Sequence, residues 1–393
     1  MASSMPAEQE SALTRNTPLE LPNFDYLRLL AASSVIFSHS FTIAQGTEEN
    51  EPFVRLMGPD NIMAIYGVCV FFVMSGFLIT MSAANSRSIV SYTASRVLRI
   101  YPALVACQLL TALILGAAFS TIGALAYIKG LDWLRYAYHY SIDMAMSWDI
   151  PTVVFYQDPR GTGLGLNGSL WTIQQELFCY VIIGILLLTR MLRWPVVLGI
   201  VLLSLPYLVP WNRDNVDVLM DLINWSIDDA RVYDYFWVGP SFFVASLIYF
   251  FWARTKSLPA WPLAICGAVF LYALYREHYY DLFPLYAAYP LLWIATNQKY
   301  RLPSLKKFGD ISYGVYLYGW PMQQAVRGWW GESITWWQLF LLSLTLSALA
   351  GYASWHLLEK PMLGLKRYFR PTPSRSRETL AAIAPAPHSS PLS

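Results

Sequence analysis

Residues 62–83 read IMAIYGVCVFFVMSGFLITMSA and contain no charged side chain. A helix of about 20 such residues is long enough to cross the hydrocarbon core of a bilayer. Lipid offers the backbone no hydrogen-bond partner, so a run of this kind must form a helix or a strand of a closed barrel. Barrel strands alternate polar and apolar residues, whereas runs such as VIIGILLL (181–188) do not. The sequence therefore predicts an all-α, polytopic membrane protein.

Composition supports this prediction, because 56% of the 393 residues are hydrophobic and only 13% are charged. A soluble domain carries about 25% charged residues. Apolar runs recur along the chain, and we predict ten membrane-spanning helices packed in one bundle. The predicted spans are Phe24–Ala44, Ile62–Ala83, Ile100–Phe119, Leu170–Thr189, Trp194–Val209, Tyr235–Ala253, Ala260–Tyr275, Leu282–Thr296, Ile311–Val326 and Thr335–Leu357.

The distribution of charge predicts the orientation. With the N-terminus in the cytoplasm, the inner segments carry 18 basic residues and the outer segments carry 8, as the positive-inside rule requires. Both termini are then cytoplasmic. We expect a polar tail over 1–22, a membrane domain over 23–370 and a disordered Pro/Ser-rich tail over 371–393. Two long outer loops, Ser120–Ser169 and Pro210–Asp234, are rich in Trp, Tyr, Asp and Asn, which stack on sugars and hydrogen-bond to them.

Arg28 and His39 are the first candidates for chemistry, because ionisable groups inside a membrane are expensive and point to function. They lie eleven residues apart, which is about 1100° of helical rotation, so both occupy one face, separated by roughly 16 Å. A neutral imidazole can take a hydroxyl proton near neutral pH. The alternative is a histidine hydrogen-bonded within the bundle and an arginine that snorkels to the headgroups.

Glu176, in LNGSLWTIQQELFCY (166–180), lies at a depth similar to that of His39. A contact between the two side chains would fix the imidazole tautomer and support its protonated form. The alternative is a protonated glutamic acid that only packs helices together.

Arg96 and Arg99 lie in the inner loop SRSIVSYTASRVLRIYP (86–102), on one side of a helix end just before the third span. They could hold the phosphates of a nucleotide-like donor, or they could be ordinary positive-inside charge. Ser75 and Gly76 would allow two helices to approach closely, or would leave room for a ligand.

Taken together, these motifs resemble the acyltransferase 3 family of bacterial multi-pass acylases. The matching stretches, in family order, are FDYLRLLAASSVIFSHSF, GVCVFFVMSGFLIT, SRVLRIYPAL, NGSLWTIQQELFCYV, ISYGVYLYGWPMQQ and LLEKPM. The resemblance implies that Arg28 and His39 are the Arg-x10-His pair of the family. It implies that Arg96 and Arg99 are its Arg-x-x-Arg motif. One departure is Gly319, which occupies the place of a second histidine found in many members.

The resemblance further implies which other residues form the site. Ser75 and Gly76 belong to the Ser-Gly-Phe segment of the family, and Trp171 and Glu176 to its Ser-Leu-Trp…Glu segment. We expect catalytic roles for His39, Arg28 and Glu176. Donor binding is expected at residues within and after the second span, and acceptor binding at Trp171. The expected donor-binding residues are Arg96, Arg99, Ser75 and Gly76.

The expected activity is transfer of an acetyl or related acyl group from acetyl-CoA or another acyl-CoA to a hydroxyl of a cell-surface or lipid-linked carbohydrate. The enzyme would lie in the lipid bilayer of the bacterial inner membrane and would use no metal and no nucleic acid. The alternative is a transporter or flippase for a glycolipid or organic anion, since Arg28, His39 and Glu176 would suit such a function equally well.

Overall fold

The computed structural model describes residues 21–59, 61–143, 150–154, 165–208, 229–305 and 307–369. These residues form helices and turns, with one isolated antiparallel bridge between Ser120 and Val153 and no β-strand. The all-helical prediction is therefore confirmed for this part of the chain. The predicted tail 371–393, almost all of the tail 1–22 and most of the loop Pro210–Asp234 lie outside the described residues.

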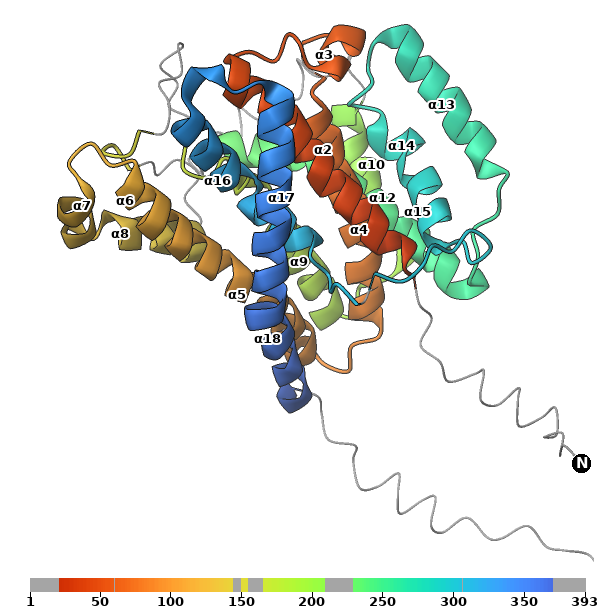
Figure 1. The fold of residues 1–393 in the computed structure, drawn as a ribbon. Coiled ribbons are helices and arrows are strands. Elements are labelled where there is room, and N and C mark those ends of the chain that lie inside the picture. The colour runs from red at the N-terminus through yellow and green to blue at the C-terminus, as the bar shows by residue number, and fades with distance from the viewer. Residues whose placement is uncertain are drawn as a thin grey trace, which may run out of the picture.

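Helices lie at all ten predicted segments (Figure 1). They are α2 (Asn23–Gln45), α4 (Met63–Ala84), α5 (Ile89–Leu110), α9 (Trp171–Leu188), α10 (Trp194–Leu208), α12 (Asp229–Thr255), α13 (Pro262–Arg276), α14 (Phe283–Tyr286), α15 (Ala288–Thr296), α16 (Ser312–Trp330) and α17 (Trp336–Ser354). Shorter helices are α3 (Pro52–Met57), α6 (Gly116–Ala118), α7 (Ala124–Gly130), α8 (Asp132–Tyr138) and α18 (Lys360–Gly364). The described residues also form three π-helical turns, Thr111–Leu115, His139–Asp143 and Trp355–Glu359, and two 3-10 turns, Gly331–Ser333 and Leu365–Phe369.

Five helices of the described chain are long and apolar enough to cross a membrane. They are α2, α4, the continuous helix Ile89–Ala118, α9 and the final helix Trp336–Phe369. The protein is thus an α-helical membrane protein. In Figure 1, α2 begins and α18 ends on the same lower side of the bundle.

Two predicted boundaries differ from the structure. The third span was expected to begin at Ile100, but α5 begins at Ile89, where the Ser88 side chain accepts a hydrogen bond from the Ser91 backbone N–H. The eighth span is divided at Ala287 into α14 and α15. Pro290 has no N–H to donate and its ring crowds the preceding turn, which favours a break in the helix before it.

α4 lies at the centre of the bundle. In its most apolar window 72% of the residues are buried, against 22% in the final helix, which lies at the periphery. At Gly76 a Cβ atom would come within 2.0 Å of the carbonyl oxygen of Phe242 in α12. The absence of a side chain at Gly76 therefore lets the two backbones touch, as small residues do in membrane proteins.

α2 and α16 run parallel and are held together by polar side chains. The Gln323 amide in α16 donates to the carbonyl of Ile36 at 2.7 Å, and one turn later Arg327 Nε donates to the carbonyl of Ile43 at 3.2 Å. Both side chains of α16 are buried. These bonds fix the register of α16 along α2, the helix that carries both Arg28 and His39.

Candidate active site

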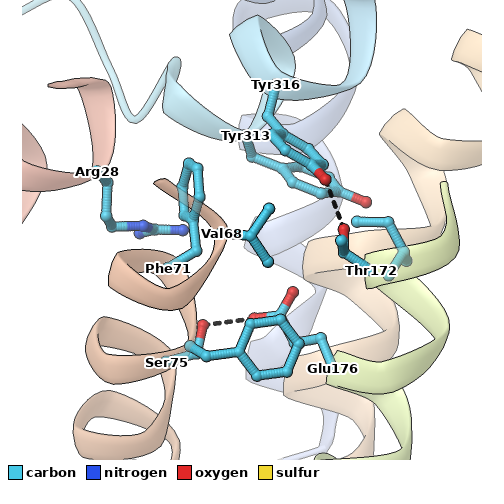
Figure 2. Close-up of a pocket in the computed structure, with 10 residues that line it drawn as sticks. Arg28, Val68, Phe71, Ser75, Thr172, Glu176, Tyr313 and Tyr316 are labelled. Carbon is cyan, nitrogen blue, oxygen red and sulfur yellow. Dashed lines mark hydrogen bonds between the residues drawn. The ribbon is translucent and has the colours of Figure 1, made fainter. Parts of the chain in front are cut away.

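A small cavity lies between four helices in the membrane part of the protein (Figure 2). Its volume is about 30 Å³, which is enough for one or two water molecules. α2, α4, α9 and α16 line it with a mixture of polar and aromatic side chains. The lining residues are Arg28, Val68, Phe71, Phe72, Ser75, Thr172, Ile173, Glu176, Tyr313 and Tyr316. Three predicted site residues, Arg28, Ser75 and Glu176, thus meet at one cavity.

Glu176 faces α4 across this cavity, and Figure 2 shows its carboxylate directed at Ser75. The Ser75 hydroxyl donates to Oε1 of Glu176, and the Tyr180 hydroxyl donates to the same oxygen at 2.6 Å. No hydrogen bond joins Glu176 to His39 among the described residues. The contact that we expected between these two side chains is therefore not made, because His39 lies outside the lining of this cavity.

A second hydrogen-bonded group closes the side of the cavity formed by α9 and α16. The hydroxyls of Thr172 and Tyr316 lie 2.5 Å apart (Figure 2), and both are within hydrogen-bond distance of the carbonyl of Ser169. All three residues are buried. Because every hydroxyl has a partner, this wall has a defined geometry.

Arg28 joins the lining of the cavity to an ion-pair network. Oδ2 of Asp310, just before α16, accepts from Nη1 of Arg28 at 3.0 Å and from Nη2 of Arg99 at 2.5 Å. Nη1 of Arg99 pairs with the fully buried carboxylate of Glu359. Burial would raise the pKa of the Asp310 carboxyl, but the charges of Arg28 and Arg99 outweigh it and hold that pKa at about 2. Asp310 is therefore ionised at neutral pH.

The side chains of Arg96 and Arg99 make separate contacts in this structure. Both lie inside α5 rather than before it, and they contact different neighbours. Nη2 of Arg96 donates to Ser82 of α4 at 3.2 Å, whereas Arg99 is committed to Asp310 and Glu359. Nε of Arg96 is buried without a hydrogen-bond partner among the described residues, so it is the member of the motif with a free donor.

His39 lies further along α2, on the same helix as Arg28 but outside the cavity lining. Its half-buried imidazole packs edge-on against the indole of Trp320, with 4.8 Å between ring centroids. Within the described residues, neither ring nitrogen has a hydrogen-bond partner. Trp320 follows Tyr316 by one turn on α16, so the two aromatic side chains connect the cavity to the imidazole.

Two predicted site residues lie away from the cavity lining. Gly76 is in the contact between α4 and α12 described above, where it packs on the backbone of Phe242. Trp171 begins α9 and packs against the main core, while its neighbours Thr172 and Ile173 reach the cavity. Contacts of Gly76 with a donor and of Trp171 with an acceptor stay predictions.

Comparison with known proteins identifies the family. A family model described as an acyltransferase domain matches residues 21–356, which include every residue of the cavity. The chain belongs to the acyltransferase 3 family. An O-acetyl transferase of Shigella phage Sf6 is 28% identical over 343 residues, covering 86% of this chain and 95% of that protein. Nodulation protein 10 of Rhizobium leguminosarum bv. viciae is 28% identical over 387 residues, covering 92% of this chain and 96% of that protein. No solved structure matches.

The structure explains why glycine occupies position 319 of this acyltransferase, where many family members have a second histidine. Gly319 lies on the face of α16 that packs on α2, and a Cβ atom there would come within 2.9 Å of the Ile36 side chain. Gly319 therefore allows the close approach of the two helices. The next residue, Trp320, is the one that contacts His39.

Sequence reasoning missed several residues of the acyltransferase site. Asp310 and Glu359 were not singled out, although each is a carboxylate next to basic residues, Asp310 after Lys306 and Lys307 and Glu359 before Lys360. Tyr313 and Tyr316 were not among the expected site residues, yet both line the cavity. The negative charge of Asp310 and Glu359 was the sequence signal that could have drawn attention to them. Nothing in the sequence places either residue beside Arg99.

Proposed function

We propose that this protein is an O-acyltransferase that moves an acetyl or related short acyl group from acyl-CoA to a carbohydrate hydroxyl. The observation that carries the proposal is the match over residues 21–356 to an acyltransferase family. His39 and Arg28 lie within this match, on one membrane helix. The name of the phage relative, O-acetyl transferase, supports acetyl as the transferred group.

In this proposal His39 acts as the general base. A nitrogen of the neutral imidazole takes the proton of the acceptor hydroxyl, and the hydroxyl oxygen attacks the thioester carbonyl. The carbon–sulfur bond breaks, and the thiolate of CoA leaves and takes up a proton. His39 could instead carry the acyl group briefly as a nucleophile. Either route leaves an ester on the acceptor and free CoA.

The donor would approach from the inner end of the cavity. Arg96 has a buried Nε without a partner in the described chain, which suits contact with a phosphate. The acyl group would then pass Arg28, Ser75 and Glu176 to reach His39. The cavity of about 30 Å³ is too narrow for a thioester-bearing chain, so donor binding requires the surrounding helices to move apart.

The acceptor would be an extracytoplasmic or lipid-linked glycan that approaches from the opposite side. Residues 165–169, the last of the predicted loop Ser120–Ser169, lie on that side of the site beside Trp320. The indole N–H of Trp320 donates to the carbonyl of Gly165 at 2.9 Å. A glycan held by this loop would place its hydroxyl close to His39.

The proposal includes a topology of ten spans with both termini in the cytoplasm of a bacterium, in the inner membrane. The excess of basic residues in the predicted inner segments supports this orientation. Labelling of single introduced cysteines in intact cells tests it, after replacement of the four native cysteines, all of which are free.

Transfer of label from [¹⁴C]acetyl-CoA tests the function. Membranes from a host that makes lipid-linked glycans would supply the acceptor, and label in the glycan fraction would be measured for wild type and for His39→Ala. We expect transfer by the wild type and none by His39→Ala at equal protein level. Movement of a glycolipid across the membrane without covalent change would instead indicate a flippase.

A further inference from the structure

Arg28, one of the residues with a proposed catalytic role, is held by a residue outside the predicted set. Its guanidinium lines the cavity and Figure 2 shows it directed inward. Asp310 is its hydrogen-bond partner among the described residues, through Nη1 alone. The remaining N–H groups of Arg28 are therefore available to a ligand, while its orientation depends on a single carboxylate.

Asp310 itself is fixed on both sides. Oδ1 accepts from the Ser312 hydroxyl at 2.9 Å, and Oδ2 accepts from Arg99. The preceding residue, Gly309, has φ of 84°, and a Cβ atom there would come within 2.1 Å of the indole of Trp355. A residue with a side chain would be strained in this conformation and would collide with Trp355. The backbone that presents Asp310 thus requires glycine at position 309.

Arg99 is the rigid support of the network. It bonds to Asp310 and Glu359, and its guanidinium lies over the rings of Tyr313 and Trp355, at 5.4 and 5.2 Å from their centroids. Contacts on several sides leave Arg99 little freedom. Arg28, by contrast, has one described partner, so Asp310 transmits the fixed position of Arg99 to Arg28.

We propose that Asp310 is a positioning residue of the acyl transfer reaction, which holds Arg28 at the inner end of the cavity with its unused N–H groups directed at the acyl donor. The inference rests on the proposed function. The carboxylate also offsets the charges of the two arginines. Without this carboxylate the site would carry more net positive charge for an anionic donor to bind. Arg28, however, would be free to move.

This gives the Asp310→Asn variant a signature that simple loss of structure would not produce. We expect it to bind [¹⁴C]acetyl-CoA at least as tightly as the wild type, because an anion that competes for the arginines has been removed. We expect transfer to fall at least tenfold at saturating donor, because Arg28 is misplaced. Asp310→Glu should recover part of the transfer rate, since it restores the carboxylate.

Glu359→Gln distinguishes a role of the ion pairs in positioning Arg28 from a role in stabilising the helix bundle. It weakens the hold on Arg99 but leaves the pair of Arg28 and Asp310 in place, so transfer should fall less than in Asp310→Asn. Glu332→Gln removes one negative charge at an exposed site and serves as the control. Binding would be measured on the purified full-length protein in lipid nanodiscs, and transfer in the membranes described above.

The possible outcomes are distinct. Transfer by Asp310→Asn at the wild-type rate would overturn the inference, and so would equal loss of binding and transfer in Asp310→Asn and Glu359→Gln. If the wild type binds no acetyl-CoA and transfers no label, the proposed function fails and this inference fails with it. Retained donor binding with lost transfer in Asp310→Asn alone would support the inference.

Discussion

The imidazole of His39 meets the indole of Trp320 at an interplanar angle of 79°, edge against face. The indole is itself anchored, because its N–H donates to the carbonyl of Gly165 and its ring packs on Gly168. Trp320 therefore sets the orientation of a histidine that has no hydrogen-bond partner in the described part of the chain.

Replacement of Trp320 should accordingly impair transfer without removing a reacting group. We expect Trp320→Ala to lower the rate by roughly tenfold to a hundredfold, since a small misplacement of a catalytic group costs this much. Trp320→Phe keeps an aromatic face and should lose less. Initial rates of label transfer, at equal protein level, measure both. A wild-type rate in Trp320→Ala would show that the ring contact does not orient His39.

Gly319→Ala should destabilise the contact between α2 and α16. The added methyl group would overlap with Ile36, and overpacking of a core costs about 1–3 kcal/mol. The second replacement Ile36→Ala should remove the clash, so that the two changes together cost less than their sum. Thermal unfolding of the purified protein in detergent measures this coupling.

Gly267→Ala in α13 is the matched control for this prediction, because a Cβ atom there has no neighbour within 4 Å. We expect it to leave the unfolding temperature unchanged or slightly raised, since alanine is the better helix former. Strict additivity of Gly319→Ala and Ile36→Ala would contradict the proposed overlap.

Gly76→Ala should act on folding rather than on donor affinity. The new Cβ atom would meet the backbone oxygen of Phe242, which cannot rotate away as a side chain can. We expect a larger loss of stability than for Gly319→Ala, and little folded protein in the membrane. Folded Gly76→Ala protein with normal stability but weak acetyl-CoA binding would place Gly76 in the donor site instead.

Glu176→Gln should separate the charge of this side chain from its hydrogen bonds. The amide oxygen can still accept from Ser75 and Tyr180, so the variant should fold with a stability close to wild type. Glu176→Ala leaves two hydroxyls without their acceptor, at a cost of about 1–3 kcal/mol for each buried group. We expect at least tenfold slower transfer in Glu176→Gln. A wild-type rate would mean that Glu176 only joins α4 to α9.

The ion pairs of Asp310 predict how stability depends on pH. Its folded pKa of about 2 lies below the unfolded value, which is about 3.9. The stabilisation is therefore fully present above about pH 5 and is lost as the pH falls from about 4 toward 2. The difference in unfolding temperature between wild type and Asp310→Asn should be constant from pH 5 to 8 and shrink below pH 4. A difference that is as large at pH 2 as at pH 7 would contradict this assignment.

The helical secondary structure and the approximate positions of the helices could be predicted from the sequence, because both depend on local composition. A long run without charge, such as residues 62–83, has one stable form in lipid, and the structure has a helix there. The common face of Arg28 and His39 follows from helical periodicity alone. The break at Ala287 could be suspected from Pro284 and Pro290, but its location depends on packing.

What the sequence determined by itself is an all-helical membrane protein with its reactive side chains spaced along the first span. Tertiary structure decided the partners of these side chains. Ser75 and Tyr180 donate hydrogen bonds to the Glu176 carboxylate, which we expected beside His39, and Asp310 pairs with both Arg28 and Arg99. Spacing within one helix is set by the covalent chain. Contacts between helices far apart in sequence depend on which faces pack together and in what register, which no local pattern encodes.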